Sequence, residues 1–106
     1  MLKASQCYRR KCSIPCRCEW DGGTSSSRII DLSFDGVLIA QDTPTPELGS
    51  KIVVELEIGP KSLPFPGEVV YTQPQEGKTG AFGVHFTSDC EDNLGKLMPL
   101  YESHLR

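Results

Sequence analysis

The sequence lacks any long apolar run, and this absence limits where the protein can work. No stretch approaches the roughly 18–20 apolar residues that a membrane-spanning helix needs. The opening residues, MLKASQCYRR, also lack the apolar block of about 7–15 residues that a secretory signal contains. We therefore expect a cytoplasmic protein that does not insert into a membrane.

Enzyme motifs are absent as well. The chain has no G-x-S-x-G nucleophile elbow, no glycine-rich phosphate loop followed by Lys-Ser/Thr, and no H-E-x-x-H pair. Of the two histidines, His85 falls on the outer face of a predicted strand and His104 in the last turn of a predicted helix. The sequence therefore predicts no catalytic residue, no cofactor and no enzymatic activity.

The five cysteines form no recognisable metal or disulfide framework. Their number is odd, and the first four, at positions 7, 12, 16 and 18, lack the C-x2-C pair typical of zinc sites. Cys16 and Cys18 alternate with charged residues, which places both on the apolar face of a strand. We expect free thiols, no bound metal, and two cysteines that behave as small hydrophobic residues.

Ten glycines and eight prolines interrupt the 106 residues at short intervals, a pattern typical of many short strands. The clearest strand runs from Ile52 to Ile58, where apolar and mostly charged residues alternate. Near residue 88 the apolar period lengthens, and Ser88-x-x-Glu91 matches a capping box. The pattern predicts six strands and a C-terminal helix over about residues 88–105, kinked or split at Pro99.

Two finer expectations concern the second strand. Gly22, Gly23 and the serines at 25–27 suggest a turn before the strand starts at Arg28. Simple alternation then places Ile30, Leu32 and Phe34 on the apolar face.

Charge is distributed unevenly along the chain. The first eighteen residues hold five basic and no acidic side chains, whereas the remainder holds six basic and fourteen acidic ones. An acidic body is a poor binder of polyanions, so we expect no DNA or RNA partner. The pattern predicts a flexible basic arm over residues 1–12 and a folded domain over residues 13–106, with a small anionic ligand or an acidic protein surface as the target.

The most informative segment is Asp31-Leu32-Ser33-Phe34-Asp35-Gly36, a D-x-S-x-x-G pattern at the end of a strand. Because Asp31 and Ser33 are two residues apart on a strand, their side chains should point to the same side of the sheet. Asp35-Gly36 is a tight-turn pair, and we expect Gly36 to adopt a positive φ there.

Together with the basic stretch before Ile14-Pro15 and the late Gly80-Ala81-Phe82-Gly83 run, this segment resembles the PilZ domain family. The resemblance implies a six-stranded antiparallel β-barrel with a C-terminal helix that binds cyclic di-GMP through an R-x-x-x-R arm and a D/N-x-S-x-x-G turn. Asp31, Ser33 and Gly36 match the second motif. The first is degenerate, because Arg9 aligns with the first arginine but Ser13 with the second.

Arg10 or Lys11 would be partial substitutes for the missing arginine, although lysine lacks the bidentate fork of a guanidinium. The implied function is a cyclic di-GMP-binding regulatory module with weakened affinity. The alternative is a PilZ-like barrel that no longer binds the nucleotide and acts only through contact with a protein.

Overall fold

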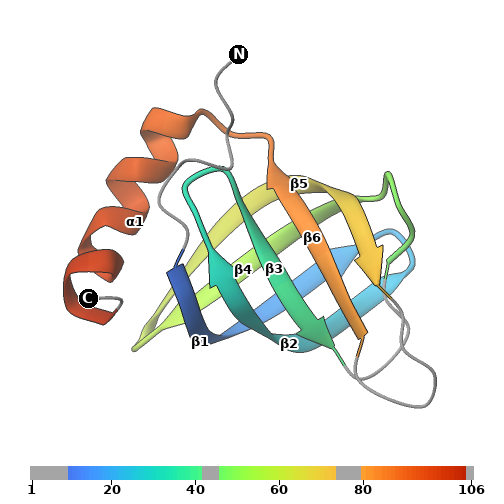
Figure 1. Ribbon diagram of the computed structural model, residues 1–106, viewed down its shortest axis with the longest axis horizontal. Helices are drawn as coiled ribbons and strands as arrows, with labels where there is room; N and C mark the ends of the chain where they lie inside the picture. The colour runs from blue at the N-terminus through green and yellow to red at the C-terminus, as the bar shows by residue number, and fades with distance from the viewer. Residues whose placement is uncertain (1–9, 42–45, 74–79, 105–106) are drawn as a thin grey trace.

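The computed structural model describes residues 10–41, 46–73 and 80–104, which form six antiparallel strands and one helix. The sheet closes in the order β1-β2-β3-β6-β5-β4, and the helix lies beside the barrel (Figure 1). The predicted six-stranded barrel with a C-terminal helix is therefore confirmed. The elements are β1 (Arg10–Trp20), β2 (Gly23–Leu32), β3 (Gly36–Gln41), β4 (Lys51–Ile58), β5 (Lys61–Gln73), β6 (Gly80–Phe86) and α1 (Cys90–His104).

Regular alternation builds most of the core. In β4, Ile52, Val54 and Leu56 are buried, as the sequence predicted. Cys16 and Cys18 on β1 are also buried, and they pair with Leu56 and Val54 across the β1–β4 ladder. Both carry free thiols in the hydrophobic core, which confirms their interpretation as small apolar residues.

The expected face of β2 is wrong by one residue over part of its length. Ile29 is fully buried and Leu32 is buried, whereas Ile30 is only half-buried. The pairing of β2 with β3 shifts register between Ile29 and Asp31, so an extra residue is inserted there. Such a bulge interrupts the two-residue alternation on which the prediction rested.

The serines at 25–27 belong to β2 rather than to a turn, because the strand begins at Gly23. Ser25 Oγ and Ser27 Oγ each donate a hydrogen bond of 2.7 Å to Oε1 of the buried Gln41 on β3. These bonds satisfy a polar group that would otherwise be costly to bury. A polar run can therefore continue as a strand when a partner strand supplies a matching acceptor.

The folded part of the chain starts slightly earlier than expected. β1 begins at Arg10, so Arg10, Lys11 and Cys12, which the sequence assigned to the arm, are strand residues. The rest of that predicted arm, residues 1–9, lies outside the described residues.

Helix α1 is anchored on the barrel by apolar and polar contacts. Leu97 is fully buried, and the Lys96 ammonium lies 5.2 Å from the centroid of the Phe65 ring. The buried Asn93 donates from Nδ2 to the backbone oxygen of Phe34 at 2.9 Å. The helix therefore holds the turn between β2 and β3.

The start of α1 differs from the predicted capping box. Asp89 caps the helix, because its Oδ1 accepts a hydrogen bond from the backbone N–H of Glu91 at 3.1 Å. Ser88 instead donates from Oγ to Asn93 Oδ1 at 2.8 Å. Pro99 lies inside one continuous helix, so the helix is not split there. Within the described residues, no helix is long and apolar enough to cross a membrane.

Candidate functional site

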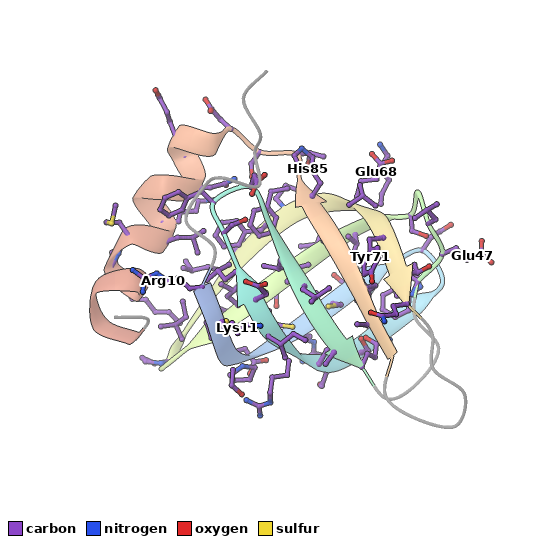
Figure 2. All side chains as sticks on the ribbon, in the orientation of Figure 1. Arg10, Lys11, Glu47, Glu68, Tyr71 and His85 are labelled. Carbon is purple, nitrogen blue, oxygen red and sulfur yellow. The ribbon has the colours of Figure 1, made fainter. Side chains whose placement is uncertain are left out.

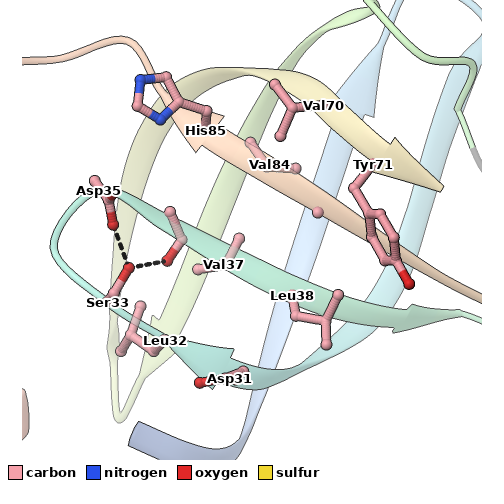
Figure 3. A pocket seen from close by; sticks show the side chains of 12 residues that line it. Asp31, Leu32, Ser33, Asp35, Val37, Leu38, Val70, Tyr71, Val84 and His85 are labelled. Atoms are coloured by element: carbon pink, nitrogen blue, oxygen red, sulfur yellow. Dashed lines mark hydrogen bonds between the residues drawn. The ribbon is translucent and has the colours of Figure 1, made fainter. Parts of the chain in front are cut away.

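The turn between β2 and β3 is fixed by the hydroxyl and amide of Ser33. The Ser33 N–H donates to the Gly36 oxygen at 2.9 Å, and Ser33 Oγ lies 3.2 Å from the same oxygen. Ser33 Oγ also donates to Asp35 Oδ1 at 2.5 Å (Figure 3). Ser33 is buried, so its first role is to set the shape of this turn.

Gly36 is required here for a reason other than the predicted one. Positive φ occurs at Gly23, Gly49 and Gly59 but not at Gly36, so the expectation of a left-handed turn residue is wrong. A Cβ at Gly36 would instead lie 2.3 Å from the Val84 backbone oxygen on the neighbouring strand β6. Glycine permits this close approach between two backbones.

A cavity of about 450 Å³ opens beside this turn on the outer wall of β2, β3, β6 and β5. Its floor is a row of paired residues in which Asp31 faces Leu38, Leu38 faces Gly83, and Gly83 faces Tyr71. A Cβ on Gly83 would lie 3.3 Å from the Tyr71 Cβ, so the glycine leaves room for the tyrosine. Figure 3 shows Asp31 and Tyr71 at opposite sides of the cavity.

The structure brings Asp31, Ser33 and Gly36 together in the lining of this cavity. Lys11 pairs with Asp31, and Arg10 pairs with Leu32, across the ladder between β1 and β2. Both basic side chains are exposed, with Arg10 extending toward α1 and Lys11 extending away from it (Figure 2). They stand beside the cavity rather than in its lining.

Of the two arm positions that align with the family's arginines, the structure describes only Ser13. Ser13 is exposed on β1, and its Oγ accepts a hydrogen bond of 3.0 Å from Arg28 Nη1 on β2. Arg9 lies outside the described residues.

Sequence reasoning missed Leu38 and Tyr71 as cavity residues. Simple alternation from Phe65 through Val69 would place Tyr71 on the apolar face of β5, but the strand shifts register between Val69 and Tyr71, and the tyrosine is 47% exposed. His85 lies on the outer face of β6, as predicted, and also lines the cavity. These side chains reach the D-x-S-x-x-G motif only because β3 pairs with β6 and β6 pairs with β5. Such pairing between distant strands cannot be recognised from a short stretch of sequence.

Cys12, on the strand beside Asp31, offers a probe of this region. Burial, and secondarily the Asp31 carboxylate, raises the pKa of the Cys12 thiol to about 11. Because the thiolate is the nucleophile, Cys12 in the folded protein should react with iodoacetamide at pH 8 about 100-fold more slowly than in the denatured protein. Peptide mapping by mass spectrometry over time measures this rate. Equal rates in the folded and denatured protein would contradict the placement of Cys12.

The cavity suits a flat, polar ligand. Carboxylates accept N–H donors, an aromatic ring provides a stacking surface, and the basic side chains beside β1 attract an anion. The described residues contain no group of three or more His, Cys, Asp or Glu placed to hold a metal ion.

A family model described as the PilZ domain matches residues 5–100. Comparison with curated protein sequences gives no significant match. Among solved structures, the PilZ domain of YcgR from Escherichia coli with c-di-GMP superposes with a TM-score of 0.76 at 15% identity, covering 93% of this chain and 89% of the other. The Bacillus subtilis inhibitor of motility, MotI/DgrA, gives 0.73 at 8% identity, covering 95% of this chain and 51% of the other.

The PilZ domain of CeSA from a cellulose-synthesizing bacterium gives a TM-score of 0.66 at 16% identity, covering 88% of this chain and 93% of the other. Identities this low show that the fold is shared, whereas the family model covers most of the sequence itself. The chain therefore belongs to the PilZ domain family, whose domains are non-catalytic receptors of cyclic di-GMP, in agreement with the prediction that it is not an enzyme.

Proposed function

We propose that this domain is a cytoplasmic cyclic di-GMP-binding module of bacterial second-messenger signalling, with weakened affinity. The observation that carries the proposal is that the complete D-x-S-x-x-G motif lines a cavity on the barrel wall. The comparisons support it, because the similar E. coli domain and the Borreliella burgdorferi PlzA protein were both solved with c-di-GMP.

In the proposed complex, the Asp31 carboxylate accepts N–H groups from a guanine edge, and Leu38 and Tyr71 lie alongside the bound base. Lys11, opposite Asp31 on β1, faces a phosphate. Binding at this wall of the barrel would change the surface that the domain offers to a protein partner.

Weakened affinity follows from Ser13, which stands where the family's motif has its second arginine. A serine hydroxyl cannot form the bidentate contact of a guanidinium, which contributes roughly 1–3 kcal/mol to discrimination in nucleic-acid recognition. Lys11 supplies charge to this side of the cavity without the fork.

Isothermal titration calorimetry with cyclic di-GMP tests the proposal, with GMP as the control ligand. We expect saturable heat with cyclic di-GMP and much weaker heat with GMP, because GMP cannot place a second guanine and phosphate on the same surface. No heat with cyclic di-GMP would reject ligand binding.

An absence of cyclic di-GMP binding would favour the second candidate function, in which the barrel acts only by contact with a protein. The observation in its favour is the exposure of Leu48, Val70 and Tyr71, which are 66%, 55% and 47% exposed. Val70 and Tyr71 line the cavity, so a partner could use the same wall of the barrel.

Substitution of Ser33 by alanine should have a moderate effect. The variant loses both hydroxyl contacts in the turn, to Asp35 and to the Gly36 oxygen, and should lose about 1 kcal/mol of stability. We expect the affinity for cyclic di-GMP to fall by roughly 5–10-fold, since the turn that carries the cavity wall becomes less well fixed. Denaturant unfolding and the same titration measure the two effects. An unchanged affinity would show that the Ser33 hydroxyl is not required to hold the turn in the conformation that binds the ligand.

A further inference from the structure

Arg28 on β2 occupies the place that the arm motif leaves without an arginine. Its side chain is exposed, and Nη1 donates to Ser13 Oγ at 3.0 Å. Ser13 is the residue that aligns with the family's second arginine. A guanidinium is therefore present at this position, although it comes from a different strand.

The direction of the Arg28 side chain matters for its function. The backbone of Arg28 is paired with Pro15 on β1, but its guanidinium reaches Ser13, which lies nearer to Lys11. Lys11 is the residue opposite Asp31. The Arg28 side chain therefore leans along the barrel wall toward the Asp31 end of the cavity.

The bulge in β2 places Arg28 and Asp31 on the same outer face. On a regular strand, residues three positions apart point to opposite faces. Here Ile29 and Leu32, also three apart, both point into the core, because the register shifts between Ile29 and Asp31. The residues that precede them, Arg28 and Asp31, accordingly share the outer wall.

The guanidinium retains binding capacity in this position. It has five N–H donors in a planar fork, and within the described residues its hydrogen-bond partner is the Ser13 hydroxyl. A phosphate accepts two such donors side by side. We propose that Arg28 contacts a phosphate of the dinucleotide held at Asp31, and so takes over part of the role of the arm's missing second arginine; this inference rests on the proposed function.

The test is a double-mutant cycle of Arg28→Gln and Ser13→Arg, titrated with cyclic di-GMP. Arg28→Gln should weaken binding by about 10-fold, and Arg28→Lys should weaken it less, because the charge remains while the fork is lost. In the Arg28→Gln background, Ser13→Arg should return the affinity to within about threefold of the wild type. In the wild type, Ser13→Arg should gain much less, because it places a second cation beside the first.

Arg17→Gln is the matched control, since Arg17 is exposed on β1 and is paired with Ser26 and Glu55, away from the cavity. It should leave the affinity unchanged, and all variants should keep the thermal midpoint of the wild type. An unchanged affinity in Arg28→Gln, with binding abolished in Asp31→Ala, would overturn the role of Arg28 and leave the proposed function intact. If Ser13→Arg raised the affinity for cyclic di-GMP equally in the wild type and in Arg28→Gln, the proposed role of Arg28 would also be overturned. Absence of binding by the wild type would overturn both proposals.

Discussion

Replacement of Asp31 by alanine should lower the affinity for cyclic di-GMP by about 100-fold or more. Asp31 lines the cavity at the end of the row that continues through Leu38 and Gly83 to Tyr71. In the proposed complex its carboxylate accepts guanine N–H donors, and each donor left unpaired in a buried contact costs about 1–3 kcal/mol. Two donors facing an alanine would reduce binding by the expected factor. Calorimetric titration of the purified variant measures it.

Two controls separate this effect from a general loss of structure. Asp31→Asn keeps one acceptor oxygen and should lose less affinity than Asp31→Ala. Asp21→Ala removes an exposed carboxylate beyond the end of β1 and should have no effect. Alkylation of Cys12 should become faster in Asp31→Ala, because the Asp31 carboxylate contributes to the raised pKa of that thiol. Retained affinity in Asp31→Ala would mean that the ligand binds elsewhere on the barrel.

The strands that the sequence predicted well are the regular ones. In β4 and in the second half of β1, every other residue enters the core, so alternation alone identifies the buried side chains. Simple alternation fails at Ile30 and Tyr71, where the ladders shift register and the inward and outward positions exchange. A bulge is decided by the pairing of two strands far apart in the chain, and one strand's sequence does not contain that information.

The candidate site was likewise predictable only where its residues are close together in the sequence. The D-x-S-x-x-G segment is contiguous, so its placement at one turn followed directly from the sequence. The cavity is not contiguous, because Tyr71 and His85 reach it from β5 and β6. The contact between Arg28 and Ser13 is similarly hidden, since it depends on the register of β1 against β2.

Replacement of Gly36 by alanine should destabilise the domain by about 3 kcal/mol or more. The added Cβ would lie 2.3 Å from the Val84 backbone oxygen, and a backbone atom cannot move aside as a flexible side chain can. Overpacking in a well-packed interior costs typically 1–3 kcal/mol and occasionally more, and here two paired strands must separate to relieve it. Such a loss is a large share of the roughly 5–15 kcal/mol that stabilises a typical domain. Urea unfolding measures it.

Gly95→Ala is the matched control for this prediction. Its Cβ would have no heavy atom within 4 Å, and within α1 alanine is favoured over glycine, so this variant should be more stable by roughly 0.5–1 kcal/mol. A comparison with Gly59, at φ 60°, separates close approach from backbone conformation. Asparagine tolerates the left-handed region, so Gly59→Asn should be mild, whereas Gly36→Asn should be at least as damaging as Gly36→Ala. If asparagine were instead better tolerated than alanine at position 36, the conformation of Gly36 rather than its contact with Val84 would set the requirement for glycine.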